Sequence, residues 1–326
     1  MRLRSIGSSV FLIVGLLLSF VSIPAHAASS LTSPVTIILP LAAGGPNDIE
    51  ARMYAGHLNT LTGHQFLVDY KLGAGGTIAA GYVAKSAPDG RTLLLSGGSF
   101  SASPALYRDL SFDIIKDFSH IALMSIKHMV LVASSEFSPA TFEQYVAYNK
   151  ASPGKANFGT TGAGGSVHLA GAWLHGLLNS KVTFVHYKGA ALGTTDLAAG
   201  RVQLSAITLQ QALPLIKTGK IRALALMGPR RSDLLPGIPT VNEQVPGFNY
   251  ESWVGFSAAA NTPEAIVKQL NDGFAKVARL AEVRKALEAQ GGAAIGGTPN
   301  ELRQLIQDES SRWRKVAQEN GIRLEE

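Results

Sequence analysis

Residues 35–48 read VTIILPLAAGGPND. The first five are apolar or β-branched and predict a buried strand, and Gly44 and Gly45 then turn the chain into a helical pattern from about Asn47 to Leu61. The alternation continues downstream, where strands are expected at 66–70 and 92–95 and a helix at 77–86. The order strand, helix, strand, helix, strand is typical of a parallel sheet covered by helices, so the sequence predicts an α/β fold.

The pattern starts again in the middle of the chain and predicts a second α/β unit. Strands are expected at 129–133, 157–160, 182–186, 202–207 and 221–227, and helices at 141–150, 166–178 and 192–199. The C-terminal part is expected to form two helices. The first starts at a cap in 261–264 and runs toward residue 290, and the second starts at a capping box of Thr298 and Glu301 with Pro299 in its first turn. No linker-like segment separates the units, so we expect short crossovers between them.

The composition excludes several classes of protein. The chain has 326 residues, which is enough for about two domains that each bury a core. It contains no cysteine, and this excludes disulfide scaffolds, thiolate metal sites and a cysteine nucleophile. Its histidines show no metal-binding spacing and its basic residues are scattered, so we expect no metal, no cofactor and no nucleic-acid partner.

The first 27 residues have the three-part layout of a secretory signal peptide. Arg2 and Arg4 precede an uncharged stretch from Val10 to Ile23, and Ala25-His26-Ala27 is a small-x-small cleavage signal. The apolar stretch is shorter than the roughly 20 residues that a membrane-spanning helix needs. We therefore expect cleavage after Ala27 and a soluble, exported chain, whose net charge falls from +6 to +4 with the loss of the two arginines.

Two glycine-rich turns are the candidate binding elements. The first is residues 40–48, and the second is residues 159–168, which read GTTGAGGSVH with Ser166 as the expected helix cap. A helix start presents unpaired N–H groups and a partial positive charge, which suit an anion. In open α/β sheets ligands bind beyond the carboxyl ends of the strands, so two such turns, one in each unit, can face one another across a cleft.

Other chemistries have weaker support. Neither turn is a nucleotide motif, because the glycine-rich loop that ends in Lys-Ser or Lys-Thr is missing. Residues 164–168 nearly match the G-x-S-x-G elbow of serine hydrolases, but His168 replaces the final glycine, which makes a secreted hydrolase using Ser166 an unfavoured alternative. Lys188 can attract an anion and Asp196 can accept from an amine, yet a surface lysine and a solvated aspartate fit the spacing equally well.

Read in order, the motifs resemble those of the periplasmic solute receptors of tripartite tricarboxylate transporters, the Bug or TctC-like family. Besides the two turns, the matching stretches are GAGGT at 73–77, APDGRTL at 87–93, PALY at 104–107, KDF at 116–118, YKG at 187–189, TDL at 195–197, PTVNE at 239–243, PGF at 246–248 and SWVG at 252–255. The resemblance covers essentially all of residues 34–322. It implies a two-domain flytrap of the type II periplasmic-binding-protein kind, in which each domain is a mostly parallel sheet flanked by helices and two crossovers join the domains. Domain I is then 28–127 with 251–326, and domain II is 128–250.

The resemblance also implies a function. It points to a periplasmic, non-catalytic receptor that captures a small organic carboxylate, such as a di- or tricarboxylate, an aromatic acid or an acidic amino acid, between its domains. The partners are then the membrane subunits of a transporter, with a membrane signalling system as the alternative, and we expect a monomer. Three departures from the family pattern are Ala43 for a common Pro, Pro46-Asn47 for Gly-Thr, and Asp69-Tyr70-Lys71 for an acidic-Asn-basic run. The identity of the ligand therefore does not follow from the resemblance.

The binding residues that the resemblance implies fall into three sets. The first jaw is Ala42, Ala43, Gly44, Gly45 and Asn47; the carboxylate is held by Thr160, Thr161, Gly162, Gly164, Gly165, Ser166 and His168; and Tyr187, Lys188, Gly189, Ala190 and Asp196 shape the second jaw.

Overall fold

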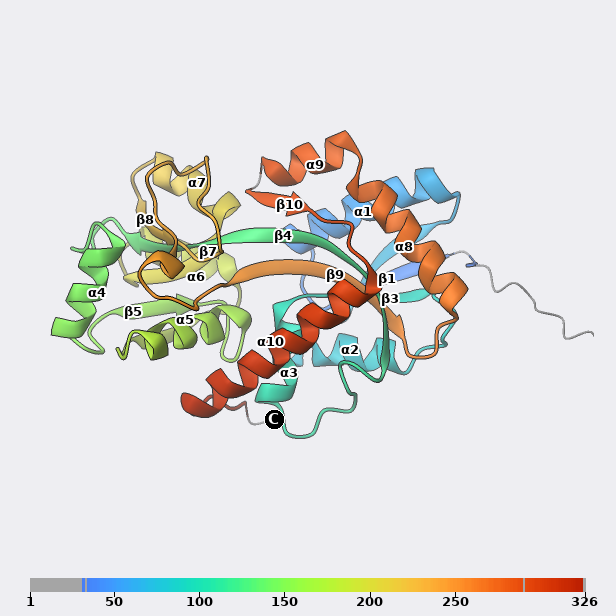
Figure 1. The fold of residues 1–326 in the computed structure, drawn as a ribbon, viewed down its shortest axis with the longest axis horizontal. Helices are drawn as coiled ribbons and strands as arrows, with labels where there is room; N and C mark the ends of the chain where they lie inside the picture. Colours follow the sequence, from blue (N-terminus) through green and yellow to red (C-terminus); the bar gives the residue numbers. More distant parts are fainter. Residues whose placement is uncertain (1–30, 33, 290, 325–326) are drawn as a thin grey trace, which may run out of the picture.

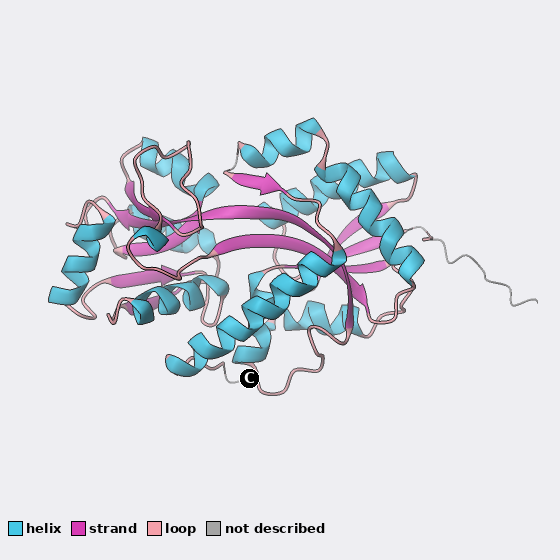
Figure 2. Cartoon of the chain, viewed as in Figure 1, coloured by secondary structure: helices cyan, strands magenta, loops and turns pink. Residues whose placement is uncertain are grey.

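The computed structural model describes residues 31–32, 34–289 and 291–324, so the expected signal peptide lies outside the described residues. Two α/β lobes lie side by side and are joined by the long strands β4 (Phe118–Ser134) and β9 (Glu251–Ala259), which pair antiparallel across the middle of the molecule (Figure 1). Helices cover the strands on both sides (Figure 2). No helix in the described part of the chain is long and apolar enough to cross a membrane.

The first lobe, on the right in Figure 1, is built around the opening stretch of the sequence. Strand β1 (Val35–Leu39) pairs in parallel with β2 (Phe66–Tyr70) and β3 (Thr92–Ser96), and β9, β4 and β10 (Gly292–Ala294) continue the sheet with antiparallel pairs. The helices of this lobe are α1 (Pro46–Thr62), α2 (Thr77–Ala84), α3 (Gly98–Leu106), α8 (Glu264–Ala278), α9 (Ala281–Glu288) and α10 (Pro299–Glu319). Ile37 packs into one apolar cluster with Tyr54 and Phe274, whereas Ile38 packs into another with Val83, because successive side chains of a strand point to opposite faces.

The second lobe repeats this plan. Strand β5 (Asn157–Thr160) pairs in parallel with β6 (Thr183–His186) and β7 (Leu204–Thr208), and β4 pairs antiparallel with β7 and β8 (Ile221–Leu226). Its helices are α4 (Phe142–Ala151), α5 (Ser166–Leu177), α6 (Ala190–Ala198) and α7 (Leu209–Lys217). Short 3₁₀ turns occur at Ala74–Gly76 and Val241–Glu243. Helix α10 lies across both lobes, and its Trp313 packs edge-on against Trp173 of α5.

The α/β fold is confirmed, but the sheet is mixed and not mostly parallel. Among the described residues four strand pairs are parallel. Five are antiparallel, namely the three pairs that contain β9 or β10 and the pairs of β4 with β7 and with β8. The reason is the path of the chain, since β4 leaves one lobe for the other and β9 returns in the opposite direction. The partner of β4 changes from β9 at His128 to β7 at Met129. This change lies next to the expected domain border, and the division into domains stays a prediction.

Several local predictions need correction. The strand expected at 129–133 is the end of β4, which begins at Phe118, and α3, α7, β9 and β10 were not predicted. The helix expected to run toward residue 290 breaks at Leu280, whose extended backbone (ψ 133°) ends α8 and precedes α9. Pro263, and not a side-chain cap, occupies the N-cap of α8. The capping box of Thr298 and Glu301 is confirmed, with Pro299 in the first turn of α10.

Candidate functional site

A cavity of about 490 Å³ lies between the two lobes and takes its wall from both. Six helices begin at this wall: α1, α2 and α3 from the first lobe and α5, α6 and α7 from the second. Each of them follows one of the strands that pair in parallel, namely β1, β2, β3, β5, β6 and β7. The carboxyl ends of both parallel sets therefore point at the same space, which is where α/β sheets bind ligands.

Five of the six helix N-termini at the cavity have no side-chain cap. Five of the six N-cap residues are glycines, at positions 45, 76, 97, 165 and 189, and none makes a side-chain cap hydrogen bond. The sixth, Thr208, forms a capping box with Gln211. Because no side-chain oxygen caps these helices, their partial positive charges face an anion uncapped. Free N–H groups are offered by α1, α3, α5 and α6, whereas Thr77 N–H at the start of α2 donates to Ala74 O. Ser166 is not the cap of α5, as the sequence predicted, but its first helical residue.

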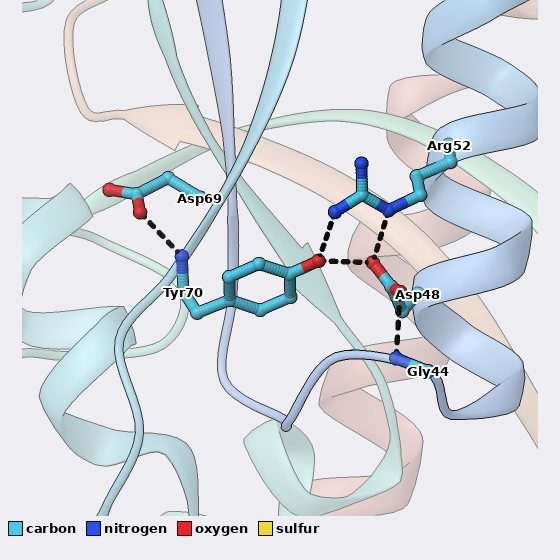
Figure 3. A network of polar contacts seen from close by, with 5 residues as sticks. All are labelled: Gly44, Asp48, Arg52, Asp69 and Tyr70. Atoms are coloured by element: carbon cyan, nitrogen blue, oxygen red, sulfur yellow. Dashed lines mark hydrogen bonds and ion pairs between the residues drawn. The ribbon is translucent and has the colours of Figure 1, made fainter.

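A polar network holds the first glycine-rich turn, residues 40–48, in place (Figure 3). The carboxylate of Asp48 is buried and accepts hydrogen bonds from Gly44 N–H (2.8 Å), Tyr70 Oη (2.5 Å) and Arg52 Nε (3.0 Å). Burial alone raises the pKa of Asp48, but the hydrogen bonds from Tyr70 and Gly44 and the charge of Arg52 outweigh burial and hold this pKa below its ordinary value. At neutral pH Asp48 is thus an anion that fixes the loop, with Gly44 held at φ +82°.

A buried ion pair lies at the floor of the cavity. Lys127 of β4 donates to Asn47 Oδ1 at 2.8 Å and lies 2.6 Å from Glu50 Oε2. Lys127 and Asn47 line the cavity, and Glu50 lies behind them. Lys127 was not among the residues predicted from the sequence, although a lysine inside the largely apolar run of residues 118–134 is a signal of a special role.

Histidine side chains outside the cavity wall support the second glycine-rich turn, residues 159–168. Gly164 N–H donates to His168 Nδ1 at 3.0 Å, and the ring of His168 lies 4.6 Å from that of His186. Burial, with a smaller effect from His186, lowers the pKa of His168 to about 4, so its Nδ1 remains free to accept at neutral pH. In the second jaw, Asp196 accepts from Tyr187 Oη at 2.8 Å and pairs with Arg201.

The predicted binding residues divide into wall residues and supporting residues. Those in the cavity wall are Ala42, Gly45, Asn47, Thr161, Gly162, Gly164, Gly165, Ser166, Gly189 and Ala190. Those that the structure places outside the wall are Ala43, Gly44, Thr160, His168, Tyr187, Lys188 and Asp196. The prediction also missed the starts of α3 and α7, which bring residues 97–99, Thr208 and Gln211 to the cavity.

The rest of the wall is largely apolar. Leu41, Phe100, Met129, Ile207 and Tyr250 are among its residues. Among the described residues that line it, Asp48 and Lys127 alone carry a formal charge, and Arg52 and Glu50 neutralise them. An anion in this cavity is therefore met by helix starts and backbone N–H groups, with apolar contacts along its body.

The wall does not contain the parts of a serine hydrolase. Ser166 contacts the hydroxyl of Tyr250, and no histidine is found among the lining residues of the described chain. A serine nucleophile needs an adjacent base, so the near match to the hydrolase elbow has no catalytic counterpart here. In the described part of the chain no three His, Cys, Asp or Glu residues are grouped so as to hold a metal ion.

Comparison with known proteins agrees with this geometry. Residues 50–322 match the family model of the tripartite tricarboxylate transporter family receptor. A UPF0065 protein from the TAR-I ttuE-ttuC' intergenic region of Agrobacterium vitis is 35% identical, over 89% of this chain and 85% of its own length.

Two solved structures from Rhodopseudomonas palustris are each 31% identical to this chain. Rpa4515 with adipate has a TM-score of 0.81 over 90% of this chain and 99% of its own. MatC with bound malate has a TM-score of 0.78 over 87% of this chain and 98% of its own. The chain therefore belongs to the tripartite tricarboxylate transporter receptor family, whose members are solute-binding receptors and not enzymes.

Proposed function

We propose that this chain is a periplasmic receptor that captures a small organic carboxylate in the cavity between its lobes and delivers it to the membrane subunits of a tripartite transporter. One observation carries the proposal: six helix starts converge on one cavity, and five of them lack a side-chain cap. A carboxylate accepts hydrogen bonds from several N–H groups at once and needs no neighbouring lysine or arginine. Two relatives have been determined with carboxylates, malate in MatC and adipate in Rpa4515.

In this proposal the ten predicted wall residues contact the ligand, and the seven predicted residues outside the wall act through them. Asp48 and Tyr70 position the first turn, and His168 positions the second through Gly164. The lobes are joined by two strands, so rotation about β4 and β9 opens and closes the cavity around the ligand.

Calorimetric titration tests the binding step. The ligands are a panel of di- and tricarboxylates, aromatic acids and acidic amino acids, and we expect at least one class to bind with a 1:1 stoichiometry. A blocking variant, Gly45→Leu, should abolish this binding. Its backbone (φ −79°, ψ 168°) accepts any residue, and a Cβ there meets nothing closer than Ala42 O at 3.7 Å, so the fold survives while the side chain enters the cavity.

The matched control is Gly56→Leu, which places the same side chain on the exposed face of the same helix, where a Cβ meets nothing within 4 Å. Equal affinity in Gly45→Leu and the wild type would contradict the proposed site, and a wild type that binds no acid of the panel would contradict the function. Delivery is tested separately by uptake of the bound acid in a strain that lacks the gene. Normal uptake in that strain would exclude delivery and favour a sensory role.

A further inference from the structure

Lys127 is a buried cation in the cavity wall, and among the described lining residues Asp48, which pairs with Arg52, carries the other formal charge. Its side chain is 9% exposed, and Nζ is held by Asn47 Oδ1 at 2.8 Å and Glu50 Oε2 at 2.6 Å. Lys127 and Asn47 line the cavity and Glu50 does not. The cationic residue of this ion pair therefore belongs to the cavity wall, and the anionic residue does not.

Glu50 keeps the side chain of Lys127 in its place. The carboxylate is 4% exposed, and it also accepts hydrogen bonds from the hydroxyls of Tyr54 (2.8 Å) and Ser125. A buried carboxylate with these donors is an anion that requires a cation beside it. The position of the ammonium group is thus determined by the protein before any ligand arrives, and such preorganisation favours specific recognition.

The ammonium group has a donor to spare. It carries three N–H groups, and among the described residues Asn47 and Glu50 are its two partners. A buried donor without an acceptor is unfavourable. Because the group borders the cavity, an acceptor for the third N–H can approach from there.

This inference rests on the proposed function, in which helix starts of the second lobe hold a carboxylate. We propose that Lys127, from the first lobe, binds the other end of the same ligand by donating its third N–H to an acceptor there. Between the two ends the wall presents apolar groups such as Phe100, Met129 and Ile207. The ligand class is therefore a carboxylic acid with an apolar middle and a hydroxyl, carbonyl or second carboxylate at its far end.

Two matched ligand series test the proposal by calorimetry. One is hexanoate, ω-hydroxyhexanoate and adipate, and the other is benzoate, para-hydroxybenzoate and terephthalate. In each series the far end changes from apolar to hydroxyl to carboxylate. We expect the wild type to bind the hydroxy acid or the diacid of a series about tenfold or more tightly than hexanoate or benzoate, in whichever series binds. One hydrogen bond to a charged donor is strong enough for this difference.

The test variant is Glu50→Gln with Lys127→Met, which removes both charges together so that neither is left buried alone. It should lose the preference to within about twofold, because the group that distinguishes the acids of each series has been removed. The matched control is Lys268→Met with Asp272→Asn, the same replacement in an exposed pair on α8 whose atoms lie 2.6 Å apart, and it should behave as the wild type.

The outcomes separate the two proposals. A wild type that binds an acid of the wider panel but none of these six contradicts this inference alone, and a wild type that binds no acid of the panel contradicts the proposed function as well. A wild type that binds without preference, or a double variant that keeps the preference, contradicts the role of Lys127 alone.

If the double variant does not fold, Lys127→Arg replaces it as the test. It preserves the charge beside Glu50, and its planar fork fits a carboxylate better than a hydroxyl. We then expect the ratio of diacid to hydroxy-acid affinity to rise by more than about fivefold, in line with the strength of bidentate pairing. An unchanged ratio in that variant would exclude contact between residue 127 and the ligand.

Discussion

The hydroxyl of Tyr70 donates a 2.5 Å hydrogen bond to Asp48 Oδ1, and so links the end of β2 to the first turn of α1 (Figure 3). Asp48 in turn accepts from Gly44 N–H, so the position of one binding loop depends on a side chain from the neighbouring strand. Tyr70 is one of the departures from the family pattern, and the structure gives it a definite role as a support of the loop.

Tyr70→Phe should therefore weaken ligand binding without touching the cavity. The variant removes the hydroxyl that is hydrogen-bonded to Asp48 and Arg52, so the loop that carries Gly44 is less firmly held. We expect the dissociation constant to rise by about threefold to tenfold, the range for one hydrogen bond. Calorimetry measures it, with Tyr82→Phe on the exposed face of α2 as the control. Identical affinities in the two variants would show that the loop does not need Tyr70.

Gly164→Ala should destabilise the protein through a contact that the sequence did not reveal. Gly164 has φ +69°, and a Cβ there lies 2.5 Å from Leu324 Cδ1 and 3.1 Å from Leu106 Cδ1. We expect a loss of about 1–3 kcal/mol in the free energy of unfolding, measured with urea.

A double-mutant cycle with Leu324→Ala tests whether Leu324 is the side chain that collides with the new Cβ of residue 164. Leu324→Ala removes this collision and leaves the positive φ of residue 164 unchanged. The double variant should recover part of the loss caused by Gly164→Ala. Strict additivity of the two changes would mean that Leu324 does not pack on the loop.

The free energy of unfolding should decrease as the pH is lowered from about 6.5 to about 4, because buried histidines stay unprotonated in the folded chain. The pKa of His168 is lowered by burial from 6.5 to about 4, so in this range the unfolded chain takes up a proton that the folded chain does not. Unfolding is then favoured as the pH falls, and below about 4 protonation also removes the acceptor of Gly164 N–H.

His168→Gln isolates the contribution of this residue. Burial also lowers the pKa of His120 and of His175 to about 4, and both remain in the variant. Urea unfolding at a series of pH values should show about one proton fewer taken up on unfolding near pH 5 than in the wild type. An unchanged pH dependence would mean that His168 is protonated equally in the folded and unfolded states.

The exported protein should begin at Ala28. This follows from the signal-peptide pattern that ends at Ala25-His26-Ala27. Intact mass spectrometry of protein recovered from the periplasmic fraction measures the cleavage site directly. Ala27→Arg should block processing, because the cleavage site requires small residues, whereas Ala28→Ser should leave it unchanged. A mature mass that still includes residues 1–27 would refute the assignment.

The two glycine-rich turns at 40–48 and 159–168, several of whose residues line the cavity, could be predicted because their signals are local. Each combines an apolar strand, glycines and a helical pattern within a few residues. The starts of α3 and α7 face the same cavity but were missed. Both helices contain an internal proline, Pro104 and Pro214, which weakens the helical pattern. Buried side chains such as Phe100, Leu106 and Leu209 compensate for this by packing into the cores.

The sequence by itself determined the α/β class, and it predicted two units, an export signal and two glycine-rich turns as binding elements, because each depends on residues that are near one another in the chain. Only the tertiary structure decided that the sheet is mixed, that Leu324 packs on Gly164, and that Lys127 lies between Glu50 and the cavity. These features depend on contacts between segments far apart in sequence. The direction of a crossover strand and the partner of a buried charge follow from how such segments pack, and neither leaves a periodic trace in the sequence.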